Sequence, residues 1–170
     1  RSLYNNMFWR TALAFFEARK QLLERLVLHH RCNVFHVDGD TIFFANPYVA
    51  FKTLYQQHNL IVQTDNPFAN AGVFYLQNVK DGDAASWVLK ELNRRIARFT
   101  YRPESVQQLP NSAWASAPPY FANADEQANL NDVIASSLSG TMSFSGGVEF
   151  MEARFRERFA PRKCFAPANR

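Results

Sequence analysis

The sequence predicts an α/β fold, in which helices pack against a β-sheet. Residues 9–29 show apolar side chains at three- and four-residue steps, which is typical of an amphipathic helix. After a short polar break, residues 34–37 form a β-branched and aromatic run, and residues 60–65 repeat this pattern. A helix that leads directly into a strand is the building unit of an α/β sheet. We therefore expect one domain built on such units.

Composition is consistent with a single folded domain. The chain has 170 residues, of which 47% are hydrophobic and 15% aromatic, enough to bury a substantial core. The net charge is +4, and acidic residues dilute the basic ones near the carboxyl end, so nucleic-acid binding is not expected. No apolar run reaches the roughly 18 residues that a membrane span needs, and no signal-peptide pattern is present.

Two further features bear on context. The chain begins with Arg1 rather than Met, so we expect a processed chain or a fragment, and missing targeting signals say little. Cys32 and Cys164 lie far apart and match no metal-binding spacing, which leaves a disulfide between them undecided.

The remaining elements follow from turn and capping signals. Asn46-Pro47 ends the first strand segment, because the residue before proline is disfavoured in a helix. Asp83 is placed to cap a helix that follows it, and Gly140 marks the end of a later one. We expect helices at residues 48–58, 84–99, 125–138 (capped by Asn123 or Asp125) and 151–159, strands at 60–65 and 73–76, a turn and strand at 143–150, and loops at 66–72 and 100–124.

Two carboxylates interrupt the apolar run of residues 34–44. Asp38 and Asp40 are separated only by Gly39, and an unpaired buried carboxylate is costly, so a core strand has no use for them. They are either ordinary turn acids where the strand enters solvent, or a pair that converges on one hard divalent cation. Glycine between them would let the backbone and a ligand approach closely.

Polar residues also cluster at two other predicted element ends. Asp65 and Asn70 flank the end of the second strand, and residues 125–127 with Asn131 open a helix. In open α/β sheets ligands bind outside the carboxyl ends of the strands, and a helix amino terminus favours anionic groups. If the sheet is mostly parallel, the first two clusters share one edge. These positions predict Asp65 and Asn131 as substrate-binding residues, although Asp65 could equally be a plain turn acid.

Three segments resemble one enzyme family. Residues 34–47, VFHVDGDTIFFANP, resemble the D-x-D strand of GT-A type nucleotide-diphospho-sugar glycosyltransferases. Within them they are most similar to the plant and algal cell-wall group with rhamnogalacturonan xylosyltransferases and extensin arabinosyltransferases. Asn70-Ala71-Gly72 resembles the N-x-G segment of this group, and residues 126–131 resemble its [D/E]-Q-x-x-L-N segment. Three motifs in the expected order are more specific than any one of them.

The resemblance implies a fold and a reaction. The fold would be a three-layer GT-A-like α/β domain with a partial mixed sheet flanked by helices, over residues 1–170. The reaction would be metal-dependent sugar transfer from a nucleotide-diphosphate donor, such as a UDP-sugar, to a glycan or glycoprotein acceptor, with retention at the anomeric carbon. It also implies a lumenal location at Golgi or other secretory-pathway membranes, with any membrane attachment made by segments absent from this chain.

The resemblance also implies residue roles. Asp38 and Asp40 would bind Mn²⁺ or Mg²⁺, and Asp38 would also contact the nucleotide. Asn70 and Gly72 would line the donor-sugar pocket. The implied catalytic residues are Gln127, beside the anomeric carbon, and Asp125 and Glu126, which would hydrogen-bond the sugar.

The chain departs from the family pattern in two respects. Only about 33 residues precede Val34, too few for the base-binding strand and loop. The four histidines (His29, His30, His36 and His58) all lie before the region that supplies a third metal ligand in related enzymes. We therefore expect an incomplete domain. His36 shares a strand face with Asp38, but a lone histidine is more often packed or on the surface than a ligand.

Two other functions compete with this one. Haloacid-dehalogenase phosphatases carry D-x-D-x-[T/V], which requires Thr or Val at position 42, where this chain has Ile42. The second alternative is a non-catalytic remnant of the transferase fold that binds a carbohydrate or a partner. The missing segments favour it, and the three motifs oppose it.

Overall fold

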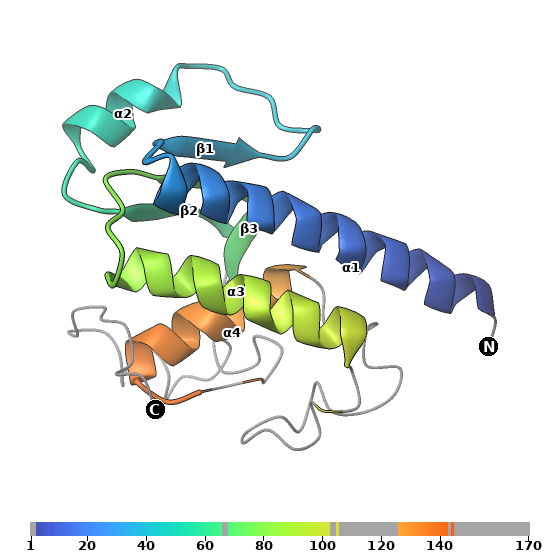
Figure 1. Ribbon diagram of the computed structural model, residues 1–170. Helices are drawn as coiled ribbons and strands as arrows, with labels where there is room; N and C mark the ends of the chain where they lie inside the picture. The colour runs from blue at the N-terminus through green and yellow to red at the C-terminus, as the bar shows by residue number, and fades with distance from the viewer. Residues whose placement is uncertain (1–2, 66–67, 103–104, 106–125, 143, 145–170) are drawn as a thin grey trace.

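The structure is a computed structural model that describes residues 3–65, 68–102, 105, 126–142 and 144. Of residues 3–10 and 13, only the backbone is described. The elements in chain order are α1 (Leu3–Glu24), a π-helical turn (Arg25–His29), β1 (Val34–Val37), α2 (Pro47–Thr53), β2 (Leu60–Asp65), β3 (Phe68–Leu76), α3 (Ala84–Tyr101) and α4 (Glu126–Ser139). The predicted α/β class is confirmed: helices and a sheet pack together (Figure 1).

The three strands lie in the order β1-β3-β2, and both pairings are antiparallel. The expected mixed sheet is therefore wrong for the strands that the structure describes. Only two residues separate β2 from β3, and a parallel pair needs a much longer crossover connection, so these strands can form only a hairpin. Because β1 and β2 are both antiparallel to β3, they run in the same direction. Their carboxyl ends point the same way, as the parallel-sheet argument required.

Helices cover both faces of the sheet. One face presents Val34, Leu60, Val62, Phe74 and Leu76 to residues of α1, the π-helical turn and α3, which together form a buried apolar cluster. On the other face α2 contributes Phe51, whose ring stacks on Tyr75 at 4.6 Å between centroids and meets Phe35 edge-on at 5.1 Å. Figure 1 shows α1 and α3 on one side of the strands and α2 on the other. Because successive side chains of a strand point to opposite faces, the sheet has an apolar cluster on one face and an aromatic cluster on the other.

Helix α4 packs against α3 and the start of β3. Their contact is a second apolar cluster, in which Leu92 and Ile96 of α3 meet Leu130 and Val133 of α4, with Ala71 of β3 beside them. This packing places the amino terminus of α4 near residues 69–72. The described helices include none that is both long and apolar enough to cross a membrane.

Several predicted boundaries are confirmed and others move. Asp83 caps α3 as expected, since its side chain accepts a hydrogen bond from the Ser86 amide at 2.8 Å. Gly140 follows α4 with a φ of +69°, a left-handed conformation that favours glycine. The first strand ends at Val37, and the helix expected at residues 48–58 ends at Thr53. The loop expected at 66–72 is largely part of β3.

Some predictions fall outside the described residues. These are the cap residues Asn123 and Asp125, most of the loop at 100–124, Cys164, and nearly all of the segments at 143–150 and 151–159.

Candidate functional site

Seven of the nine predicted site residues meet where β1 ends, β3 begins and α4 begins. Asp38 follows β1, and its amide donates to the Gly72 carbonyl oxygen of β3 at 2.7 Å. Asn70 folds back over the same stretch, since its Oδ1 accepts from the Gly72 amide at 2.7 Å. The first and second sequence motifs are therefore hydrogen-bonded to each other.

Gly72 is required by close packing. A Cβ atom added at this position would collide with the Asp38 carboxylate, lying 2.6 Å from its Cγ, and would be 3.1 Å from Asn70 Oδ1. The 2.6 Å separation is shorter than real Cβ contacts allow, and the 3.1 Å separation is tighter than most of them. The N-x-G motif thus has a physical reason here: only glycine leaves room for the carboxylate of the D-x-D motif.

Two basic residues of α1 connect the D-x-D motif to α4. Arg19 donates to Asp38 Oδ1 at 2.9 Å and to Glu126 Oε2 at 2.5 Å. The Lys20 ammonium forms an ion pair with Glu126 Oε1. Glu126 is therefore held by two cations from one turn of α1, and Arg19 also reaches Asp38. Through Arg19, these contacts connect Asp38 of the first motif to Glu126 of the third.

Lys20 is fully buried, with a relative exposure of 0%. Its Nζ lies 3.4 Å from His36 Nε2 and from the Ala71 carbonyl oxygen, and 4.6 Å from the centre of the Phe74 ring. Burial lowers the pKa of Lys20 below its usual value, although the carboxylate of Glu126 opposes the shift. The contact between Lys20 and Glu126 is therefore shielded from water.

His36 is packed rather than placed as a ligand. Its ring lies 4.7 Å from that of Phe74 between centroids, and it is buried between the sheet and α1. Burial first, and then the positive charges of Lys20 and Arg19, lower the pKa of His36 to about 4. The imidazole is consequently neutral at physiological pH.

Gln127 bridges the end of β2 and the first half of β3. Its Nε2 donates to Asp65 Oδ2 at 3.0 Å, and its Oε1 accepts from the Ala71 amide at 3.4 Å. Asp65 at the end of β2 thus contacts the site through Gln127.

Asn131 lies one helical turn further along α4 and is fully buried. Its side-chain amide bonds both backbone groups of Ala69: Oδ1 accepts from the amide at 2.8 Å, and Nδ2 donates to the carbonyl oxygen at 2.9 Å.

The two remaining predicted site residues are less constrained. Asp40 is exposed in the turn after β1, where the Thr41 amide donates to the Asp38 carbonyl oxygen at 3.1 Å. Asp125 lies outside the described residues. Within the described part of the chain, no group of three or more His, Cys, Asp or Glu side chains is placed to hold a metal ion. Asp38 and Asp40 are the carboxylates that could contribute to such a site.

Sequence reasoning did not single out Arg19 and Lys20 as site residues. The spacing of apolar residues does indicate that Lys20 is buried. The three- and four-residue steps of the apolar stripe pass through Phe16, Lys20, Leu23 and Val27. A lysine inside such a stripe faces the core, and a buried lysine needs a charged partner.

No protein-family model, curated protein or solved structure matches this chain.

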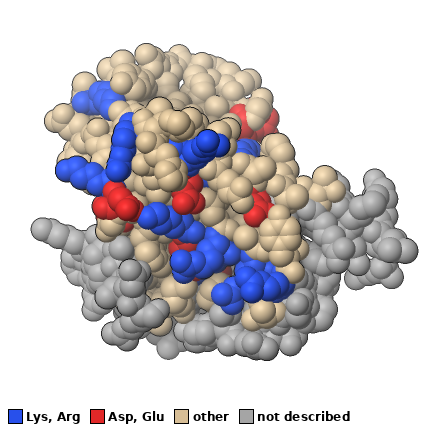
Figure 2. Space-filling model, in the orientation of Figure 1, with Lys and Arg blue, Asp and Glu red and all other residues tan. Residues whose placement is uncertain are grey.

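Charged side chains are unevenly distributed over the surface. Figure 2 shows basic and acidic side chains interleaved across the middle of one face, below an upper part that is mostly uncharged. In the same orientation α2 lies in this upper part. Large apolar side chains are exposed in α2 and in the segment before it: Ile42, Phe43, Phe44, Tyr48 and Val49.

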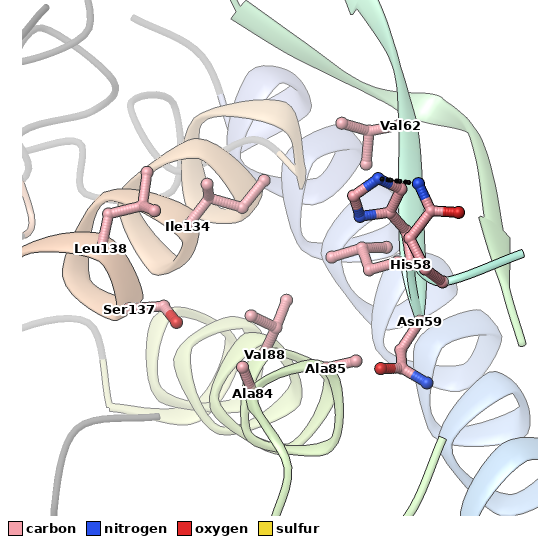
Figure 3. Close-up of a pocket in the computed structure, with 11 residues that line it drawn as sticks. His58, Asn59, Val62, Ala84, Ala85, Val88, Ile134, Ser137 and Leu138 are labelled. Atoms are coloured by element: carbon pink, nitrogen blue, oxygen red, sulfur yellow. Dashed lines mark hydrogen bonds between the residues drawn. The ribbon is translucent and has the colours of Figure 1, made fainter. Parts of the chain in front are cut away.

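A separate pocket of about 850 Å³ lies between α3, α4 and the start of β2 (Figure 3). Its wall is mainly apolar, with Leu60, Val62, Val88, Ile134 and Leu138 among the lining residues. Gln57 and His58 line it as well, joined by a hydrogen bond of 3.1 Å. None of the predicted site residues lines this pocket, so it is distinct from the candidate site.

Substitution of Gly72 tests the packing of the D-x-D carboxylate. We expect Gly72→Ala to displace the Asp38 side chain, which is 43% exposed and can rotate outward. The variant should fold, and a ¹³C spectrum should show the Asp38 carboxyl resonance shifted from its position in the unmodified chain. Gly39→Ala is the matched control, because a Cβ there meets nothing within 4 Å. An Asp38 resonance that responds equally to both substitutions would refute this packing.

The lowered pKa of His36 predicts a stability loss in mild acid. The unfolded histidine titrates near pH 6.5 and the folded one near 4, so between these values the unfolded chain binds the additional proton. Stability should therefore fall as the pH drops from 6.5 to 4, by up to about 3 kcal/mol from this group. Urea unfolding at pH 7 and pH 4.5 should show a smaller loss in His36→Gln. The exposed-site control His29→Gln should behave like the unmodified chain; equal losses in all three would contradict the assignment.

Proposed function

We propose that this chain forms part of a GT-A type glycosyltransferase that transfers a sugar from a nucleotide-diphosphate donor with retention at the anomeric carbon. One observation carries the proposal: three motifs spread over residues 38–131 meet in space. Gly72 packs on Asp38, Arg19 joins Asp38 to Glu126, and Gln127 bonds Ala71.

The donor set suits a hard divalent cation. Asp38 Oδ1 accepts from Arg19, which leaves Oδ2 for another ligand, and Asp40 is exposed beside it. Carboxylate oxygens are the ligands that Mg²⁺ and Mn²⁺ prefer, and such ions commonly keep positions for substrate phosphates. When bound by Asp38 and Asp40, the ion would neutralise charge on the leaving diphosphate.

The chain's own residues supply orientation and charge. Asn70 and Gly72 pack against the Asp38 carboxylate, and the donor sugar would lie beside this group. Glu126 is buried and each of its carboxylate oxygens is held by a cation, so a sugar hydroxyl would bond it by displacing Arg19 or Lys20. Gln127, whose side-chain amide is held by Asp65 and the Ala71 amide, would lie beside the anomeric carbon. Because these groups are held before substrate arrives, little reorganisation accompanies the reaction.

The transfer needs no covalent intermediate on the protein. The bond between the anomeric carbon and the diphosphate oxygen breaks, and the acceptor hydroxyl attacks from the same face. The proton of that hydroxyl passes to the departing phosphate oxygen. Gln127 is a weak nucleophile, which fits a stabilising role beside an oxocarbenium-like transition state. The donor would be a UDP-sugar and the acceptor a glycan or glycoprotein in the secretory pathway.

Titration of UDP into the full-length protein tests this proposal. With Mn²⁺ present we expect binding that weakens at least about tenfold when the metal is removed or when Asp40 is changed to Ala. Asp81→Ala is the matched control, since Asp81 is an exposed carboxylate whose partner is Lys90. UDP binding that is indifferent both to metal and to Asp40→Ala would overturn the proposal. Metal-dependent binding without sugar transfer would instead favour the non-catalytic alternative.

A further inference from the structure

Strand β3 bulges at the candidate site. Its register with β2 changes from Val62 opposite Phe74 to Thr64 opposite Ala69. Between these pairs β2 has only residue 63, whereas β3 has residues 70–73. Four residues of β3 therefore span the distance of one residue of β2, and this segment contains Asn70 and Gly72. Bulges of this kind re-aim side chains and occur often beside functional sites.

A bulge needs other partners for its backbone, because its groups leave the ladder. Helix α4 provides them. Asn131 bonds both the amide and the carbonyl oxygen of Ala69, the residue at which regular pairing with β2 resumes. One turn earlier, Gln127 accepts from the Ala71 amide.

The distance between Gln127 and Asn131 along α4 matches the distance between Ala71 and Ala69 along β3. Residues four apart on a helix are separated by about 6 Å along its axis, and residues two apart on a strand by roughly 6.6 Å. Gln127 and Asn131 can therefore meet Ala71 and Ala69 at the same time. A shift of β3 by one residue along α4 would break both contacts.

Asn131 has no free hydrogen-bonding atom for a ligand. Its Oδ1 accepts from Ala69, while Nδ2 donates to Ala69 and also to the Gln127 carbonyl oxygen at 2.8 Å. The side chain is fully buried, so a donor sugar could reach it only by breaking these bonds.

We propose that Asn131 is a positioning residue: it fixes the bulge of β3, and hence Asn70 and Gly72, against α4 without contacting the donor. This inference rests on the proposed function, since the sugar pocket is what the bulge shapes. It replaces the substrate contact expected for Asn131 from its position in the sequence. Asn131 acts at the base of the pocket, where it sets the distance between the β3 wall and the α4 wall.

The variant Asn131→Asp removes the donor and keeps the shape. Its carboxyl oxygen can still accept from the Ala69 amide, but the hydrogen bonds to two backbone carbonyl oxygens are lost. Asn59→Asp is a closely matched control. Asn59 Nδ2 also donates to two backbone carbonyl oxygens, those of Gln77 and Asn78, both at 3.0 Å and at the opposite end of β3.

The experiment measures how much more tightly the protein binds a UDP-sugar than UDP alone. Dissociation constants for UDP, UDP-xylose and UDP-galactose are measured with Mn²⁺, at a temperature where each variant is folded. We expect Asn131→Asp to lower the ratio of the UDP constant to the UDP-sugar constant about tenfold, with UDP itself changed less than about twofold. Asn59→Asp should change neither. An unchanged ratio in Asn131→Asp overturns the inference, whereas no UDP binding by the unmodified protein overturns the proposed function.

A measurement on the unmodified protein separates positioning from contact and does not depend on the variant folding. The side-chain amide protons of Asn131 should exchange with water at least about a hundredfold more slowly than those of an exposed asparagine. Their resonances should stay within the linewidth when the UDP-sugar replaces UDP. Rapid exchange, or a large shift caused by the sugar, contradicts the inference.

Discussion

The ion pair between Lys20 and Glu126 is the constraint on which the rest of the site depends. A fully buried ammonium is costly unless a carboxylate and further polar groups surround it. Lys20 meets that requirement with Glu126, the Ala71 carbonyl oxygen and the Phe74 ring. These partners belong to α4 and β3, so the solvation of one side chain fixes three elements relative to one another. Arg19, the residue before Lys20 in α1, extends the network to Asp38.

This network explains why distant motifs form one site. The end of β1 is held against β3 by the bond between Asp38 and Gly72, and glycine makes that approach sterically allowed. The start of α4 is held against the same part of β3 by Gln127 and Asn131. Ion pairs therefore hold α1 against the site, while the side-chain amides of Gln127 and Asn131 set the register of α4 along β3. The bulge of β3 lies between these two sets of restraints and takes its shape from both.

The sequence predicted local features well, because they depend on neighbouring residues. The strand at residues 60–65, the Asp83 cap and the helix that follows it were all visible as patterns. Strand pairing was predicted less well: the mixed sheet was expected from family resemblance, although even the loop expected at residues 66–72 is too short for the crossover between parallel strands. Lys20 was not recognised as a site residue, because its spacing places it in the apolar stripe but does not identify its partner, Glu126, 106 residues later. For Asn131 the sequence gives no partner at all, since Ala69 contributes only backbone groups.

A double-mutant cycle on Lys20 and Glu126 tests the central claim most directly. Urea unfolding is measured for the unmodified chain, Lys20→Met, Glu126→Gln and the double variant. Each single substitution leaves one buried charge without its main partner and should cost about 3–5 kcal/mol, and the double variant should cost clearly less than the sum, with a coupling of at least about 1 kcal/mol. If the two costs add to within about 0.5 kcal/mol, the two side chains do not interact, and the account of how the site is assembled is contradicted.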